Sequence, residues 1–506
     1  MPLPDSTPVL VGVGQVSERP GEPGYRGRSP VELAADAARE ALDDAAVSPA
    51  EIDTIAAVRQ FENSLPFSQA PLGRSDNFPR SVAGRIGAAP YRAVLEVGGG
   101  QGPQHLVNEF AATIAAGDAR VVLLTGAEAI STIERLAASD NPPDFTEHAP
   151  GSLEDRGFGL DGIITPEHFP YGLTDTPAYY ALFENARRAR LGLSRSAYAA
   201  AMGELFAPFT RVAARHPHAA APVERSAAEL VTVTAANRPI ADPYTRYLVA
   251  RDKVNQGAAL LMMSLAAARR LGVPKQKWVF VAGHADLRER DLLDRADLSA
   301  SPAAVAATRH ALDLAGIDMA GLATLDLYSC FPAPVFAVTD AFGLSPADPR
   351  GLTVTGGLPF FGGAGNNYSM HAIATTAERV RAEPGSYGFV GANGGMMSKY
   401  STGVYTTRPV TWRPDDSVKL QAELDARPAP GVAPSPDGPA IIETYTVKHS
   451  RGGDRKGIVI GRLAADGRRF LAHGDDLLDL LTEGEPIGAR VTARTDDDGN
   501  HVSASS

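Results

Sequence analysis

The chain has 506 residues, 44% of them hydrophobic, and a formal net charge of −11 at pH 7. This length can hold roughly two to four domain-sized units and bury a large core. The acidic balance argues against a nucleic-acid partner, which requires a basic face. A single cysteine in the whole sequence excludes a disulfide framework and a cysteine-rich metal site.

The first residues, MPLPDSTPVLVGVG, lack the basic segment and long apolar run of a signal peptide. No stretch approaches the run of about 18 apolar residues that a membrane span requires. We therefore expect a soluble, cytoplasmic protein.

Strand and helix patterns alternate from the N-terminus to about residue 128. Residues 30–46 form an amphipathic pattern with Pro30 in the first turn, which predicts a helix. A second helix is expected directly after Gln101. Buried strands are predicted at 8–15, 54–61, 91–97 and 119–128. Such alternation with short connections predicts a parallel sheet covered by helices.

The pattern changes at about residue 129 and stays largely helical to about 240, which predicts an inserted helical lobe. Strand–helix alternation then resumes to about 407, so two similar halves form a duplicated α/β core. A stretch rich in proline and charge follows and has the composition of a linker. Short strands with glycine and aspartate turns end the chain and predict a small antiparallel, OB-like barrel. The expected units are 1–270 with the lobe at about 129–240, 271–412, the linker 413–438, and 439–506.

Four segments, in this order, resemble motifs of the thiolase superfamily. DKVNQGAALLMMS (252–264) resembles the NDGAAA element, and TLDLYSCFPAPVFAVTDAFGL (324–344) resembles the segment with the NEAF or HDCF motif. GGLPFFGGAGNNYSMHA (356–372) resembles GGxxxxGHPxGA, and GANGGMMSKYSTGVY (391–405) resembles the final CxG-type strand pair. The resemblance covers roughly residues 7–410. It is greatest to the sterol-carrier-protein-type thiolases, and within them to actinobacterial thiolase-like proteins of type 1 with an extra C-terminal β-domain.

The resemblance implies a five-layered α/β/α/β/α fold with its active site where the two halves meet. It also implies that CoA or an acyl-CoA binds through the inserted lobe, with no permanently bound cofactor. Most relatives are dimers or tetramers, so the resemblance makes a homodimer possible and leaves the oligomeric state open.

The same resemblance places no cysteine at the reactive positions. Gln101 stands where a thiolase has its nucleophilic cysteine, at a helix N-terminus that lowers a thiol pKa. Asn393 stands at or next to the second cysteine, and Tyr328 at the histidine of HDCF. Asn366, or Gly363 in another register, takes the place of the activating histidine. Because the thiolase mechanism needs two cysteines and this chain has one, ordinary thiolysis is excluded.

Cys330 lies at the end of an apolar strand in a strand-to-helix turn, where nucleophiles occur in other folds. His371 or Asn366 could then serve as its partner. The related thiolases carry a cysteine here that is not acylated. We therefore interpret Cys330 as a small buried side chain.

Three glycine turns, at 98–102, 362–365 and 394–395, could bring backbone N–H groups together as an oxyanion hole, with Gly363, Gly394 and Gly395 at the ligand. Asn366, Asn367 and Asn393 could donate hydrogen bonds to a thioester carbonyl. Alternatively, these glycines only permit tight turns and close packing. His105, one turn into the helix after Gln101, is the best histidine for a residual base, with a buried structural histidine as the alternative.

An arginine cluster in ENARRARLGLSR (184–195) lies in the inserted lobe. These arginines could bind CoA phosphates, or form a solvated helix face; they are Arg187, Arg188, Arg190 and Arg195. EDRGFGLDG (154–162) lacks the ligand spacing of a calcium loop, and the histidines of HPH (216–218) are interpreted as surface residues. No metal site is predicted.

Three functions remain open. The first is an acyltransferase with altered chemistry, in which Asn366 or His105 acts on a thioester without an acyl-cysteine. The second is a binding protein that holds an acyl-CoA, and the cysteine count favours it over a conventional acetyl-CoA acetyltransferase. The third is a scaffold subunit whose C-terminal barrel docks a protein partner.

Overall fold

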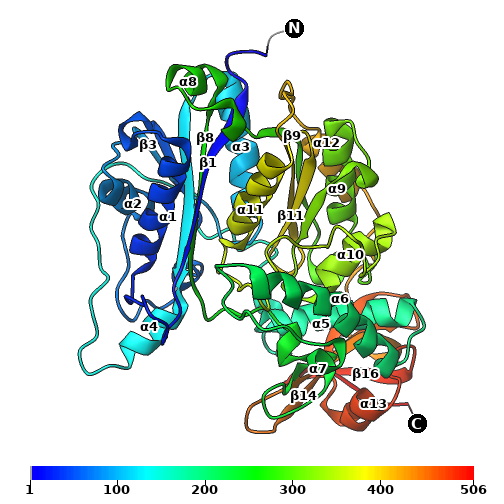
Figure 1. The fold of residues 1–506 in the computed structure, drawn as a ribbon. Coiled ribbons are helices and arrows are strands. Elements are labelled where there is room, and N and C mark those ends of the chain that lie inside the picture. Colours follow the sequence, from blue (N-terminus) through cyan, green and yellow to red (C-terminus); the bar gives the residue numbers. More distant parts are fainter. Residues whose placement is uncertain (1–2, 506) are drawn as a thin grey trace.

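The computed structural model describes residues 3–505, and Figure 1 shows two sheets packed side by side with helices between and outside them. The first sheet has the strand order β1-β8-β4-β2-β3-β5. Its strands are β1 (Pro8–Ser17), β2 (Thr54–Ala57), β3 (Arg92–Leu95), β4 (Val121–Ala129), β5 (Glu154–Asp155) and β8 (Asn255–Ser264). β8 runs antiparallel to both of its neighbours, β1 and β4. The parallel sheet predicted from the sequence is therefore found only among β2, β3, β4 and β5.

The second sheet has the order β10-β11-β12-β9. Its strands are β9 (Phe280–Arg288), β10 (Thr324–Leu327), β11 (Tyr387–Gly394) and β12 (Lys399–Thr406). Only β10 and β11 are parallel, while β12 pairs antiparallel with β11 and β9. Apolar runs reveal buried strands but not their direction, because helices cover both faces of either kind of sheet here.

Helices complete the five layers that the resemblance implies, and this fold prediction is confirmed. α1 (Pro30–Ala45) and α2 (Phe78–Ile86) cover the outer face of the first sheet, and α9 (Pro302–Ala315) covers that of the second. α3 (Gly102–Ala116) and α11 (Tyr368–Ala382) lie between the two sheets and contact both (Figure 1). Three further helices of the two halves are α4 (Ile130–Ala137), α8 (Leu265–Arg270) and α10 (Pro332–Phe342). No helix within residues 3–505 is long and apolar enough to cross a membrane.

The inserted lobe contains α5 (Thr176–Arg190), α6 (Arg195–Arg215) and α7 (Ala227–Val231), followed by the short strands β6 (Pro239–Ala241) and β7 (Tyr244–Thr245). Asp175 caps α5 and Ser194 caps α6, each by accepting a backbone N–H three residues later. α6 thus begins shortly after α5 ends, and both helices contact α10.

The C-terminal unit is a five-stranded barrel, closed by the pairing of β13 with β14, and the predicted barrel is confirmed. β15 and β17 pair in parallel, which corrects the expectation of a wholly antiparallel barrel. Its elements are β13 (Gly438–His449), β14 (Arg455–Leu463), β15 (Arg469–His473), α13 (Leu478–Glu483), β16 (Arg490–Asp496) and β17 (Gly499–Ala504). Ile458, Ile460 and Leu471 belong to the same hydrophobic core as the lobe. The barrel is therefore packed into the molecule.

The stretch expected to be a linker contains a helix, α12 (Ser417–Asp425), that packs on β9 and α9. The Ser417 hydroxyl accepts the Asp286 N–H at 2.9 Å, and Leu424 is buried. The high proline and charge content of the stretch hid this helix, and of its apolar residues Leu424 is buried whereas Val418 is exposed.

Candidate functional site

A glycine turn delivers the N-terminus of α3 to the interface between the two halves. Gly99 has a φ of 138°, and its N–H donates to the Asn366 side-chain oxygen at 2.8 Å. The Asn366 amide nitrogen in turn donates to the Arg59 carbonyl at 2.7 Å and to the Ser64 hydroxyl at 2.8 Å. Asn366 therefore holds the turn in place, and both of its donated hydrogen bonds go to the protein.

Gln101 caps this helix by position but makes no side-chain capping bond, and it is 6% exposed. A Cβ at Gly99 or Gly394 would lie 2.1 or 1.8 Å from its Oε1, so both glycines are needed for its close approach. Within residues 3–505, Oε1 has no hydrogen-bond partner. The position that the resemblance assigns to the thiolase nucleophile thus holds a buried amide whose oxygen accepts no hydrogen bond within residues 3–505.

Aromatic side chains complete the walls of this site. The Tyr328 hydroxyl lies so near Gly100 that a Cβ there would be 2.1 Å from it. Tyr180 comes from α5, accepts the Asn393 amide at 2.8 Å and stacks on Phe331 at 4.4 Å between ring centroids. The sequence indicated Tyr328 and Asn393 through motifs, but it carried no signal for Tyr180, which reaches the site from the inserted lobe.

Cys330 is buried beside these groups, with Tyr180 and Asn393 as its side-chain neighbours. Burial raises the pKa of its thiol to about 12, even though hydrogen bonds from both neighbours favour the thiolate. His371 is engaged elsewhere, since its Nδ1 lies 2.9 Å from Gln15 Oε1. A neutral, enclosed thiol agrees with the interpretation of Cys330 as a packing residue.

The remaining glycine-turn residues bind the protein itself. The Gly363 N–H donates to the Arg251 carbonyl at 2.7 Å, and the Asn367 amide donates to the Gly126 carbonyl at 2.6 Å. Gly395 accepts the Tyr180 hydroxyl at 2.9 Å through its carbonyl. Their expected role as oxyanion donors stays a prediction.

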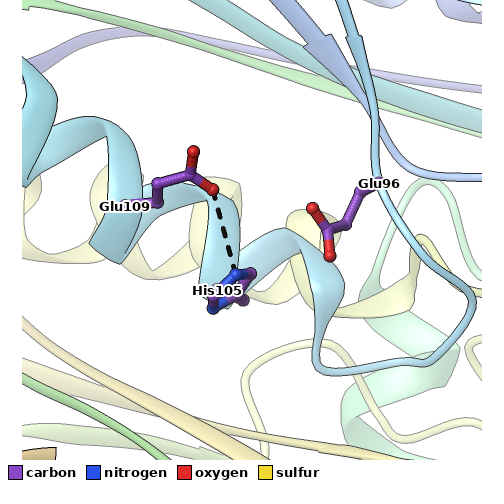
Figure 2. Close-up of side chains that lie close together, drawn as sticks. All are labelled: Glu96, His105 and Glu109. Carbon is purple, nitrogen blue, oxygen red and sulfur yellow. Dashed lines mark ion pairs between the residues drawn. The ribbon is translucent and has the colours of Figure 1, made fainter. Parts of the chain in front are cut away.

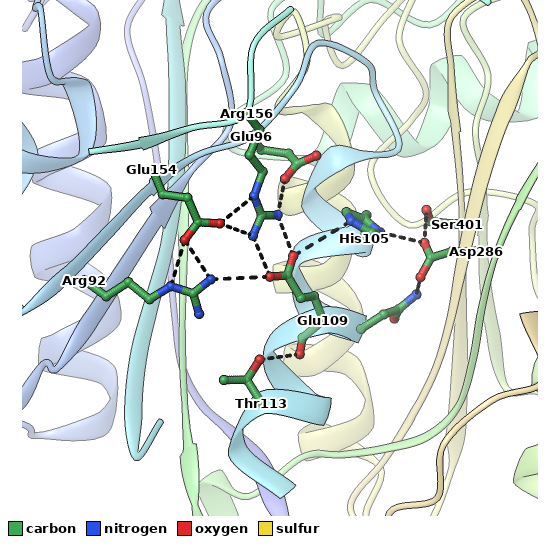
Figure 3. A network of polar contacts seen from close by, with 10 residues as sticks. Arg92, Glu96, His105, Glu109, Thr113, Glu154, Arg156, Asp286 and Ser401 are labelled. Carbon is green, nitrogen blue, oxygen red and sulfur yellow. Dashed lines mark hydrogen bonds and ion pairs between the residues drawn. The ribbon is translucent and has the colours of Figure 1, made fainter. Parts of the chain in front are cut away.

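His105 lies in a network of charged side chains (Figure 3). Its Nδ1 lies 3.2 Å from Asp286 and its Nε2 lies 3.9 Å from Glu109. Burial lowers its pKa, but the hydrogen bond and charge of Asp286, together with Glu96 and Glu109, raise it to about 9. At neutral pH, His105 is therefore protonated and is an ion-pair partner, not a free base.

Glu96, His105 and Glu109 lie close enough together to resemble a metal site, with ligand atoms within 4.8 Å of one another (Figure 2). The Arg156 guanidinium already bridges the two carboxylates, 2.6 Å from each. This cation provides the positive charge that a metal ion would bring, so the cluster is an ion-pair network.

Comparison with known structures identifies the family. A monomeric SCP2-thiolase-like protein type 1 from Mycobacterium smegmatis is 49% identical, with a TM-score of 0.85, over 99% of this chain and 100% of that chain. The chain belongs to the SCP2-thiolase-like protein type 1 family. The signature of the thiolase-like protein type 1 additional C-terminal domain matches residues 419–498, and no functionally curated protein matches the chain.

More distant structures share the fold of this thiolase-like protein. The Ltp2-ChsH2(DUF35) aldolase is 18% identical with a TM-score of 0.59, over 80% of this chain and 99% of that chain. Human mitochondrial 3-ketoacyl-CoA thiolase is 16% identical with a TM-score of 0.55, over 79% of this chain and 99% of that chain.

The four lobe arginines of this thiolase-like protein have intramolecular partners. Arg187 and Arg190 both bind Asp340 at 2.6 Å, and Arg188 binds Glu485 at 2.6 Å. Arg195 donates to backbone carbonyls of the barrel, including that of Gly484 at 2.9 Å. A role in CoA phosphate binding stays a prediction for these residues, and it would require breaking these contacts.

Proposed function

We propose that this chain binds an acyl thioester of CoA without forming an acyl-enzyme. The observation that carries the proposal is that Gln101 is a buried amide whose Oε1 accepts no hydrogen bond within residues 3–505. The resemblance assigns this position to the thiolase nucleophile. Such an acceptor costs stability unless a ligand satisfies it. The pantetheine arm of CoA carries amide N–H groups that can donate to Gln101 Oε1, while the Gln101 amide N–H groups can reach a thioester carbonyl.

The packing around Gln101 favours the binding of one ligand over a reaction between two substrates. Buried aromatic side chains limit the space there; they are Tyr180, Tyr328 and Phe331. Cys330, with a pKa of about 12, supplies no thiolate at neutral pH. These features support binding over acyl transfer.

Arg251 supports a CoA ester in particular, because CoA is anionic. The Arg251 N–H donates to the Leu358 carbonyl at 3.1 Å, and the Arg251 carbonyl accepts the Gly363 N–H at 2.7 Å. These two hydrogen bonds join its backbone to the site. Its Nε has no hydrogen-bond partner within residues 3–505, and burial together with the like charges of Arg246 and Arg225 lowers its pKa. An incompletely neutralised arginine cluster beside the site suits the phosphates of CoA.

Titration calorimetry with acetyl-CoA and a longer acyl-CoA tests this proposal. We expect saturable binding that Arg251→Gln weakens roughly tenfold, the order expected for one charge-assisted hydrogen bond. Arg451→Gln removes the same charge from an exposed barrel turn and should leave binding unchanged. Absence of saturable binding, or an equal loss in both variants, would contradict the proposal.

Two alternative functions predict outcomes in other measurements. Turnover of a thioester that falls on replacing Asn366 or His105 would indicate an altered acyltransferase. Stable co-purification of another enzyme, lost on changing the barrel surface, would indicate a scaffold. We keep the cytoplasm as the expected compartment.

A further inference from the structure

A crevice of about 570 Å³ lies outside the thiolase-like site, where the C-terminal end of α6 meets α11 and the loop at 348–351. The residues that matter here are Gln15, Arg211, Arg215, His216, His218, Thr375 and Arg379. None of them is part of the turns around Gln101. Its volume suits a small-molecule ligand.

A chain of hydrogen bonds runs along the crevice and leaves the Thr375 hydroxyl proton without an acceptor among residues 3–505. His371 Nδ1 lies 2.9 Å from Gln15 Oε1, and the Gln15 amide donates to the Thr375 hydroxyl at 3.2 Å. His216 Nδ1 accepts the His218 N–H at 3.3 Å, so its Nε2 carries the proton that faces Thr375 at 3.2 Å. Because the Thr375 oxygen accepts two bonds, its own proton is left to donate to a ligand.

The charge of the crevice is positive although the chain as a whole is acidic. Four arginines and two carboxylates line it, which gives a net charge of +2 against −11 for the chain. Arg350 is paired with Asp348 at 2.7 Å. Among residues 3–505, Arg211, Arg215 and Arg379 form no ion pair, although Glu378 also lines the crevice and its carboxylate interacts with the charge of Arg379. Three guanidinium groups therefore remain available to an anion.

The histidine segment is held rigidly in place. Arg19 donates to the Ala219 carbonyl at 2.8 Å, and the Gln256 amide donates to the His218 carbonyl at 2.8 Å. Burial, with smaller contributions from nearby charges, lowers the pKa of both His216 and His218 to about 4. At neutral pH they are uncharged hydrogen-bonding groups in a half-buried wall, which corrects their interpretation as surface residues.

We propose that this crevice binds the phosphate group of a small phosphorylated molecule, as a second ligand site of the protein. Three guanidinium groups and the Thr375 hydroxyl present only donors, which suit the several acceptor oxygens of a phosphoryl group. A carboxylate has only two oxygens and would leave donors unused.

Calorimetric titration with inorganic phosphate and pyrophosphate, at constant ionic strength, tests the proposal on the full chain. We expect saturable binding of one anion, weakened roughly tenfold by Arg215→Gln and by Arg379→Gln. Both side chains are exposed, so neither change endangers folding. Thr375→Val should weaken binding several-fold through loss of the donor alone.

A matched control makes the result decisive. Arg451→Gln removes the same charge from an exposed turn of the barrel and should leave phosphate binding unchanged. Absence of saturable binding, insensitivity to both crevice arginines, or tighter binding of malonate than of phosphate would overturn the proposal. Competition by CoA would make a CoA phosphate the occupant, and lack of competition would make it a separate phosphorylated molecule.

Discussion

Gln101 Oε1 is buried without a hydrogen-bond partner, so the residue weakens the folded state that contains it. We expect Gln101→Met, which keeps the length of the side chain, to raise the free energy of unfolding by about 1 kcal/mol. The same change should weaken thioester binding. Urea unfolding and calorimetry measure the two effects, and a loss of stability with unchanged affinity would show that Gln101 is a structural residue.

The Cys330 thiol has a pKa of about 12 because of burial, so it stays neutral through the ordinary pH range. We expect no reaction with iodoacetamide at pH 8 in the native protein and one labelled thiol per chain in denaturant. Cys330→Ala should retain acyl-CoA binding. Rapid native labelling would contradict the packing role.

The motifs suggested several side chains for the site at the start of α3, but not what these side chains bind. The structure brings Gly99 against Asn366 and Gly100 against Tyr328, whereas the sequence leaves Gly363 open as the alternative to Asn366. Hydrogen-bond partners depend on side-chain rotamers and on segments that are distant in the sequence. The hydrogen bond from Asn393 to the Tyr180 hydroxyl could therefore not be predicted from the sequence. The composition of the lobe likewise did not reveal that its arginines are paired within the fold.

His105 of α3 pairs with Asp286 of β9, and this ion pair joins the two halves of the core. Its folded pKa of about 9 lies above the ordinary 6.5, so its stabilisation is complete below pH 6.5 and is lost as the pH rises through 9. The side chain is 37% exposed, and solvent screening reduces the expected effect to about 1 kcal/mol.

Urea unfolding at pH 6 and pH 9.5 measures this effect. His105→Gln should remove that part of the pH dependence, whereas His148→Gln, at an exposed histidine, should leave it unchanged. An unaltered pH profile in His105→Gln would contradict the role of the pair.

Arg469 fixes the barrel to the second half of the core. It is fully buried, binds Glu443 at 2.7 Å and donates to the Leu293 carbonyl at 2.9 Å. Arg469→Met should lower the free energy of unfolding by about 3 kcal/mol, because Glu443 loses its buried partner. Its neighbour Arg468 is exposed, and Arg468→Met is the matched control. Equal unfolding midpoints for the two variants in urea would contradict this account.

The sequence predicted most elements of the fold because their apolar periodicity is strong. It could not give the direction of β8, which depends on the path of the chain through the lobe. It also missed α12, where a short apolar face is embedded among prolines and charges. Buried strands were thus predicted better than the connections between them.

The covered edge of the first sheet disfavours dimerisation of the protein through that edge. β5 covers part of the β3 edge by pairing with Val94 and Leu95, and Arg92 binds Glu154 at 2.9 Å. A covered edge is not available for pairing with a second chain. We therefore expect a monomer of 53.0 kDa by light scattering, in contrast to the dimer that the resemblance to the wider thiolase family makes possible. A dimer mass would contradict this expectation.

The central claim is that a thiolase-like fold here holds an acyl thioester without reacting with it. Incubation with a panel of acyl-CoAs, followed by intact mass and by measurement of free CoA and products, tests it most directly. We predict saturable binding with the protein mass unchanged and no CoA released. An acyl adduct on Cys330, or release of CoA with formation of product, would contradict the claim.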